Sequence, residues 1–175
     1  MHRSAEIIVT PRLILRSLAS ADIQVLYDHV LSDAAVMAAA LFGGPMSFSQ
    51  SIRFIDRSFD NGSGKRGLGV LVERDTQQVV GFAGLLQCAA LGKPDFELGF
   101  VLRRSAWGRG YATEIGRGQL HYGFHVLGLP RILALASPKN NASIAVLKKI
   151  GMDFHSNVLD AQRGDRLVYA ARRPL

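Results

Sequence analysis

The feature that most constrains the fold is a change of hydrophobic period near residue 107. The run FELGFVL (96–102) is almost wholly apolar, which is typical of a buried central strand. From residue 112 to 127, apolar residues instead recur at helical spacing. Between the two stands WGRGYATE (107–114), whose glycines suit the interior of neither element. A strand, a glycine-rich turn and a helix in this order predict backbone N–H groups gathered at a helix N-terminus, where they can bind an anion.

The rest of the chain alternates strand-like and helix-like segments without repeats or linkers. Hydrophobic patterns predict the further strands 12–18, 68–74, 78–87 and 131–137, and a closing hairpin that turns at residues 163–164. They predict the further helices 20–31, 52–59 and 143–151, with Ser20 capping the first and Asn or Ser capping the last. The fold class is therefore α/β (α+β), with a single domain over residues 1–175.

The net charge indicates what kind of partner the protein binds, and the cysteine content indicates in which cellular compartment it is found. The net charge is +7, which favours an anionic partner: nucleic acid, an acidic membrane surface or a phosphate-rich small molecule. Cys88 is the only cysteine, so no internal disulfide can form, and it is best interpreted as a small buried apolar residue. The N-terminal stretch lacks the apolar core of a signal peptide, and no segment is long enough to span a bilayer. We expect a cytoplasmic location.

Two patterns resemble functional motifs but stand in the wrong context. Gly62, Gly64 and Gly67 satisfy G-x-G-x-x-G, yet a predicted helix precedes them and a strand follows, the reverse of a dinucleotide site. His121 and His125 would share a helix face, but the zincin pattern needs Glu where this chain has Tyr122, and no third ligand is evident. We therefore expect a surface loop, an exposed polar face and no metal site.

The segment VLRRSAWGRGYATE (101–114) resembles the acetyl-coenzyme A signature of the GNAT N-acetyltransferases, [Q/R]-x-x-G-x-[G/A], with Gly110 and Ala112 in its last two named positions. PKNNASIAVLKKIGM (138–152) is similar to the second coenzyme-binding block of the family, and TPRLILR, VVGFAGL and FELGFVL are similar to strands of its RimJ/RimL-like branch. The resemblance implies a mixed, mostly antiparallel sheet of six to seven strands with about four flanking helices. It also implies a splay between the fourth and fifth strands, 96–102 and 131–137.

The resemblance implies acetyl-coenzyme A as cosubstrate. The residues implied in its binding are Phe100, Val101, Leu102, Trp107, Gly108, Arg109, Gly110, Tyr111, Ala112, Thr113, Asn140 and Ser143. Trp107 departs from the general signature, which has Gln or Arg there, but a site built from backbone amides needs no polar side chain at that position. The alternative is a loop that only connects the strand to the helix and binds no ligand.

The implied reaction is direct attack of an amine on the acetyl thioester in a ternary complex. Glu97 interrupts an apolar strand and is the candidate base; a water relay, or a purely structural carboxylate paired with an arginine, is the alternative. Ser143 is the candidate acid toward the thiolate, with a plain helix cap as its alternative. Leu147 occupies the position where many GNAT enzymes carry a tyrosine acid. A backbone N–H near residues 101–102 would polarise the thioester carbonyl.

The acceptor is the least determined part of the prediction. The resemblance implies that segments 36–47 and 155–166 bind a primary amine, either a protein N-terminus or a small molecule. Because 36–47 carries almost no charge, it argues against a strongly charged acceptor held there. Neither a membrane nor a nucleic acid is an expected partner, and the chain is expected to be a monomer or homodimer. The alternatives are a non-catalytic acetyl-coenzyme A sensing module and a basic nucleic-acid-binding domain, whose binding would weaken steeply with salt.

Overall fold

The computed structural model describes residues 5–38, 40–60 and 67–174, which form one eight-stranded sheet. Its order is β1-β2-β3-β4-β5-β6-β8-β7. The strands are β1 (Glu6–Val9), β2 (Leu13–Arg16), β3 (Gly67–Glu73), β4 (Val79–Cys88), β5 (Asp95–Leu102), β6 (Arg131–Ala136), β7 (Asp153–Asp160) and β8 (Gly164–Arg172). The α-helices are α1 (Asp22–Leu26), α2 (Ala34–Met37), α3 (Phe48–Ser58), α4 (Tyr111–His121) and α5 (Asn141–Lys149).

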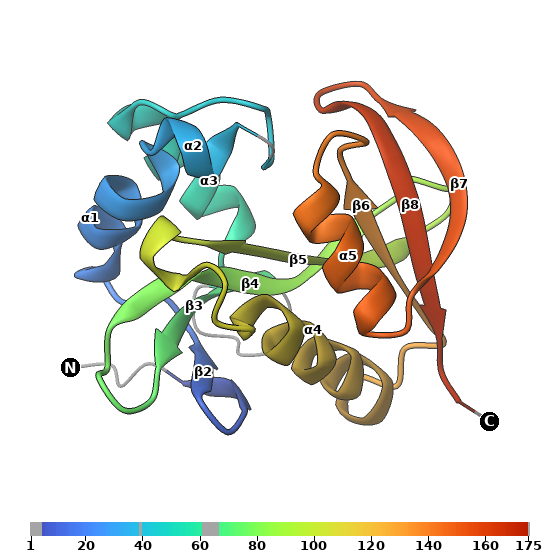
Figure 1. Cartoon of the computed structure of the whole chain (residues 1–175), viewed down its shortest axis with the longest axis horizontal. Coiled ribbons are helices and arrows are strands. Elements are labelled where there is room, and N and C mark those ends of the chain that lie inside the picture. The colour runs from blue at the N-terminus through green and yellow to red at the C-terminus, as the bar shows by residue number, and fades with distance from the viewer. Residues whose placement is uncertain (1–4, 39, 61–66, 175) are drawn as a thin grey trace.

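Every neighbouring pair of strands is antiparallel except β5 and β6, which run parallel. These two strands share a single registered pair, Glu97 with Leu133, whereas β6 pairs with β8 through six residues. The sheet therefore opens between β5 and β6 beyond that pair. Figure 1 shows the result, with β6, β8 and β7 diverging from the N-terminal strands. The mostly antiparallel sheet and its splay confirm the expected architecture.

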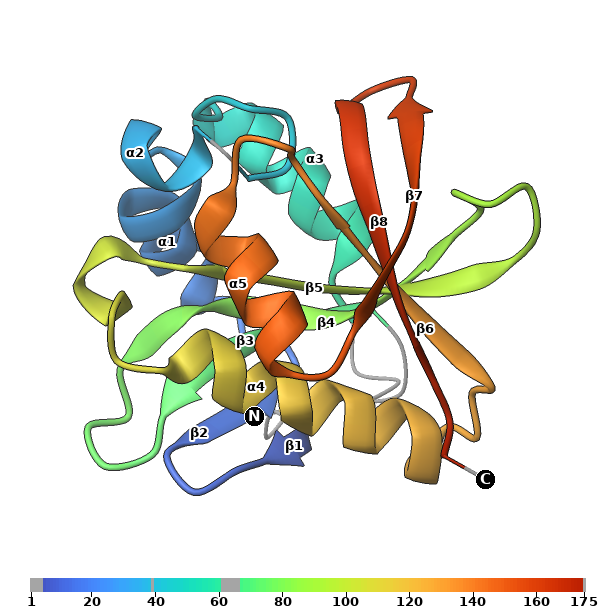
Figure 2. The ribbon, with the colours of Figure 1, turned by 45° about the vertical axis from the view of Figure 1, so that its right-hand side comes forward.

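Helices cover the two faces of the sheet unequally. α4 and α5 pack on one face, where Leu120 and Leu147 join a core cluster with Ile132 of β6. α1, α2 and α3 pack on the opposite face over β3 and β4, around Phe82. Figure 2 shows α4 and α5 together in front of the sheet and α1–α3 grouped above β5 in this view. The site residues of β5 thus lie between two helical layers.

Several local expectations need correction. The sheet has eight strands because the N-terminal segment adds β1, and the four-residue α2 was also missed, since both are too short to establish a period. Ser20 caps nothing: the N-cap of α1 is Ala21, and the Asp22 carboxylate accepts a hydrogen bond from the Ala19 N–H at 2.7 Å. α3 begins at a capping box formed by Ser47 and Gln50, ahead of the residues at positions 52–59 whose helical spacing predicted it.

Two helices run into π-helical segments, Tyr27–Leu31 after α1 and Tyr122–Val126 after α4. The hydrophobic period continues through both, so the sequence predicted one continuous helix in each place. The helix predicted at 143–151 begins at residue 141, with Asn140 as its N-cap.

Candidate active site

The loop between β5 and α4 presents a row of unpaired backbone donors. After Leu102 the chain makes a 3₁₀ turn (Arg104–Ala106) and reaches Gly108 and Gly110, whose φ angles are +70° and +80°. Gly110 is the N-cap of α4. None of the described residues accepts a hydrogen bond from the backbone N–H groups of residues 108–113, whereas the Glu114 N–H donates to the Gly110 carbonyl at 3.1 Å. Such a cradle of orphan N–H groups at a helix N-terminus is suited to phosphate oxygens.

The side chains of this loop turn toward the protein rather than toward the cradle. Trp107 donates through Nε1 to the Leu102 carbonyl at 2.8 Å. The Arg109 guanidinium and the buried Tyr111 hydroxyl both donate to Oε1 of Glu73 on β3. These side chains thus bind protein groups and leave the backbone N–H groups of the loop without protein partners among the described residues.

Two residues that sequence reasoning missed fix the position of the loop. Hydrogen bonds from Thr76, Tyr111 and Arg109 lower the pKa of Glu73 to about 2, so its carboxylate stays ionised. Arg12 donates through Nη1 to the Arg109 carbonyl at 2.9 Å and through Nε to Glu114 at 2.7 Å. Nothing in the local sequence of β3 or β2 signals these contacts, because each partner is distant along the chain.

The splay between β5 and β6 forms a narrow cleft of about 110 Å³. It is lined by the β5 residues Phe100 and Val101, by residues 134–137 at the end of β6, and by Asn140, Ser143 and Leu147 at α5. The Arg103 N–H donates to the Val80 carbonyl at 2.9 Å, and β4 and β5 pair without a register shift from there back to Asp95. Because donors alternate along an antiparallel strand, the N–H groups of Phe100 and Leu102 point away from β4, toward the splay, and that of Val101 points toward β4.

At the other wall of the cleft, Asn140 caps α5. Its side-chain carbonyl accepts a hydrogen bond from the Ser143 N–H at 3.0 Å. The cap is thus Asn140, and the Ser143 hydroxyl does not serve as one. Leu147, which is 3% exposed, presents an apolar side chain where many relatives were expected to carry a tyrosine.

Glu97 lies where the cleft meets a second, larger cavity, and it lines both. The residue is buried, and its carboxylate receives two hydrogen bonds from Arg163 in the β7–β8 turn, at 2.8 and 3.1 Å. Arg163 also donates to Asp160 at 3.2 Å. Burial would lower the pKa of Arg163, but Glu97 and Asp160 outweigh it and raise the pKa above its usual value. The arginine is therefore a permanent cation between two carboxylates.

Comparison with known proteins agrees with this geometry. Residues 12–153 match the family described as "Acetyltransferase (GNAT) domain". The chain belongs to the GNAT acetyltransferase family. It is 31% identical over 146 residues to the uncharacterized N-acetyltransferase YoaA of Bacillus subtilis, an alignment that covers 83% of this chain and 81% of that protein. Its enzyme class is accordingly N-acetyltransferase.

Solved GNAT structures have the same fold. An acetyltransferase from Agrobacterium tumefaciens superposes with a TM-score of 0.77 at 27% identity, covering 99% of this chain and 98% of that one. A spermidine N-acetyltransferase from Vibrio cholerae, solved in complex with CoA and spermine, superposes with a TM-score of 0.73 over 92% of this chain and 95% of that one. At 16% identity, this second similarity shows the fold alone.

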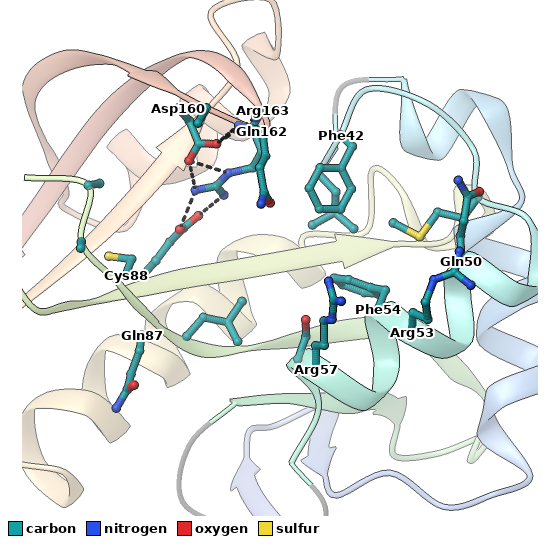
Figure 3. A pocket seen from close by; sticks show the side chains of 18 of the residues that line it. Phe42, Gln50, Arg53, Phe54, Arg57, Gln87, Cys88, Asp160, Gln162 and Arg163 are labelled. Atoms are coloured by element: carbon teal, nitrogen blue, oxygen red, sulfur yellow. Dashed lines mark hydrogen bonds and ion pairs between the residues drawn. The ribbon is translucent and has the colours of Figure 1, made fainter.

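This GNAT domain has a large cavity of about 920 Å³ next to Glu97, hereafter the acceptor cavity. Its walls are the connection after α2, α3, the end of β4 and the β7–β8 turn (Figure 3). The lining residues include Leu41, Phe42, Gly44, Pro45 and Met46 from the first connection, and Val158, Leu159, Asp160, Ala161, Gln162 and Arg163 from the last hairpin. Segments 36–47 and 155–166, predicted to meet around the acceptor, thus do border one cavity. The sequence predicted the helix α3 but not that it borders this cavity, to which it adds Arg53 and Arg57.

The glycine triplet, the histidine pair and Cys88 are the remaining features singled out in the sequence. Gly62 and Gly64 lie outside the described residues, and Gly67 opens β3. The rings of His121 and His125 are 4.6 Å apart, and the described residues hold no group of three metal-ligating side chains. Burial raises the pKa of Cys88, which lines the acceptor cavity as a half-buried thiol. Within the described ranges, no helix is both long and apolar enough to cross a membrane.

Proposed function

We propose that this protein transfers an acetyl group from acetyl-coenzyme A to a primary amine, by direct attack within a ternary complex. The observation that supports this most directly is the row of unpaired N–H groups at residues 108–113, continuous with the splayed edge of β5. An anionic, extended ligand fits both features: the pyrophosphate on the loop, and the pantetheine arm in the cleft. Bound there, acetyl-coenzyme A would supply an activated acetyl thioester.

The residues around the cleft divide the remaining tasks. The backbone N–H groups of Phe100 and Leu102 are placed to pair with the arm and to polarise a carbonyl, a contribution that is large in a water-poor site. Asn140 holds the first turn of α5, which presents Ser143 to the cleft. Two reactants held in the right orientation react as if one were present at an effective concentration of about 10⁵–10⁸ M, so positioning alone accelerates the transfer.

Proton transfer is assigned to Glu97 and Ser143. As the amine nitrogen bonds to the acetyl carbon and the carbon–sulfur bond breaks, Glu97 receives the amine proton, directly or through one water, and later releases it to water. The Ser143 hydroxyl passes its proton to the leaving sulfur while it takes another from a water molecule. The bidentate pair with Arg163 keeps Glu97 in place and leaves a further lone pair on each carboxylate oxygen. The acceptor, a protein N-terminus or a small amine, occupies the acceptor cavity. The RimJ/RimL-like branch, the cytoplasmic location and the oligomeric state, monomer or homodimer, stay predictions.

Calorimetric titration with acetyl-coenzyme A tests the coenzyme site. We expect one-to-one binding that Gly108→Asp abolishes, because a carboxylate would stand among the N–H donors. Gly92→Asp is the matched control: the two glycines have similar positive φ angles, +70° at Gly108 and +74° at Gly92, and a Cβ added at either would meet no atom within 4 Å beyond its chain neighbours. Equal affinities for the two variants, or no binding by the unaltered protein, would contradict the proposal.

Steady-state kinetics test the proton-transfer roles once an acceptor amine is in hand. We expect Glu97→Gln to lower kcat by about a hundredfold, a typical value for loss of a general base, and Ser143→Ala to lower it by about tenfold or more. Neither substitution should change the dissociation constant of acetyl-coenzyme A. Unchanged kcat in either variant would remove that residue from the mechanism, and binding without any turnover would favour a sensing module instead.

A further inference from the structure

The acceptor cavity has two ends of opposite charge. At the end next to the cleft, the carboxylates Glu97 and Asp160 and the cation Arg163 line the cavity; Arg166 lines the neighbouring cleft and donates to backbone carbonyls. Burial would raise the pKa of Asp160, but hydrogen bonds from the N–H groups of residues 162 and 163 and from the Arg163 side chain lower it, so this carboxylate is ionised near neutral pH. This end attracts a cation.

The opposite end is formed by Arg53 and Arg57, four residues apart on α3 and therefore on one helical face. Figure 3 shows them across the cavity from the Arg163 cluster. No ion pair joins either guanidinium to a carboxylate among the described residues, whereas Arg163, which lines the same cavity, is paired twice. Two uncompensated guanidinium groups on one wall attract an anion, and guanidinium geometry suits a carboxylate or phosphate.

Much of the remaining lining is apolar. It includes Leu41, Phe42, Met46, Phe54 and Leu86, beside the uncharged polar residues Gln50, Ser58, Gln87 and Gln162. A ligand that fills the cavity therefore meets a cation-attracting end, an apolar middle and an anion-attracting end in sequence. The uncharged connection after α2 agrees with the sequence analysis; the charge comes from α3 instead.

We infer that the acceptor is a small molecule whose amine is separated by an apolar segment from an anionic group, a carboxylate or a phosphate. This inference rests on the proposed function, because it places the amine at Glu97, where the acceptor cavity meets the coenzyme cleft. Arg53 and Arg57 then hold the distal anion and determine specificity. A polyamine is disfavoured, because its distal ammonium would face the two arginines without a counter-ion.

A matched panel of straight-chain amines tests this assignment. The probes are ω-amino carboxylates from glycine to aminohexanoate, the ω-aminoalkyl phosphonates of the same lengths, the uncharged ω-amino amides and the corresponding diamines. Release of the coenzyme A thiol gives kcat/KM for each. We expect carboxylates or phosphonates to exceed the amide of equal length by about tenfold or more, the value of one charge-assisted hydrogen bond, and diamines to be the poorest. The ratio of carboxylate to phosphonate identifies the preferred anion.

Substitution of the two arginines locates the effect. In the double variant Arg53→Gln, Arg57→Gln, KM for the best anionic acceptor should rise about tenfold, while kcat, KM for the amide and the dissociation constant of acetyl-coenzyme A stay unchanged. Arg173→Gln, an exposed arginine that lines none of the cavities, is the control and should change nothing.

The outcomes separate the inference from the proposed function. Equal activity on amides and anionic acceptors, preference for diamines, or an unaltered KM in the double variant would overturn the inference and leave the acetyltransferase proposal standing. Binding of acetyl-coenzyme A without acetylation of any probe would overturn the inference, and the calorimetric result would then be all that supports the coenzyme site.

Discussion

Glu97 shows what one residue in a pattern can and cannot reveal. A carboxylate inside the apolar run FELGFVL predicts a special role, and the structure places it at the junction of the cleft and the acceptor cavity. The sequence suggested an arginine as a possible partner of Glu97 but not which arginine, because Arg163 is 66 positions further along the chain. The local sequence of the β7–β8 turn does not indicate which strand the Arg163 side chain contacts.

The burial of this pair predicts a large stability effect. Arg163→Met would leave the Glu97 carboxylate, 11% exposed at its side chain, without its counter-ion, so we expect a loss of about 3 kcal/mol in the free energy of unfolding. Arg104→Met is the comparison, since Arg104 is 62% exposed in its pair with Asp33 and should cost below about 1 kcal/mol. Urea denaturation followed by circular dichroism measures both. Similar losses in the two variants would mean that burial of the Glu97 pair is unimportant.

Among the elements, β3 has a role that its sequence conceals. The strand was predicted correctly from its apolar residues, yet its last residue, Glu73, holds the β5–α4 loop through Arg109 and Tyr111. Arg12, just before β2, holds the same loop through the Arg109 carbonyl. Contacts from two other strands thus preorganise the backbone donors of the loop, and preorganisation lowers the ordering cost of binding.

Glu73→Gln should therefore weaken acetyl-coenzyme A binding by about tenfold in calorimetry, because the loop loses its charged anchor. The same variant should change the pH dependence of stability. The folded pKa, about 2, is below the ordinary 4.5, so the stabilising contribution of Glu73 is present above pH 4.5 and is lost as the pH falls toward 2. The gap in Tm between the unaltered protein and the variant should narrow over that interval. Asp75→Asn, at an exposed turn residue next to β3, should show neither effect; a constant gap in Tm would contradict the assigned pKa.

Helix and strand boundaries are predictable where a local sequence signal, such as a capping box, marks them. The capping box at Ser47 and Gln50 is readable as S-x-x-Q before an apolar run, and it was overlooked in favour of the period that follows. The short strand β1 has no such signal, and tertiary pairing creates it, because β2 offers it an edge. The helix α2 has a capping aspartate, Asp33, but its four residues are too few to show a helical period.

At the scale of the whole molecule, the fold class, the mostly antiparallel sheet and the splay were predictable, because motifs for successive strands occur in order along the chain. The acceptor cavity was predictable only as a meeting of two segments. Its two oppositely charged ends depend on the rotation of α3 about its axis and on the reach of the β7–β8 turn, and both are set by packing in three dimensions.

The strand order also has a consequence for how the chain is made. β1 to β5 are neighbours in the sheet in the order of synthesis, so each strand can pair as soon as the next one leaves the ribosome. The open edge of that unfinished sheet is β5, and its partner β6 follows only after α4 has been synthesised. Until then the nascent chain carries an apolar strand with one unpaired edge, the feature that most readily recruits other chains. The nascent chain therefore passes through an aggregation-prone stage along the same strand that lines the cleft in the finished sheet.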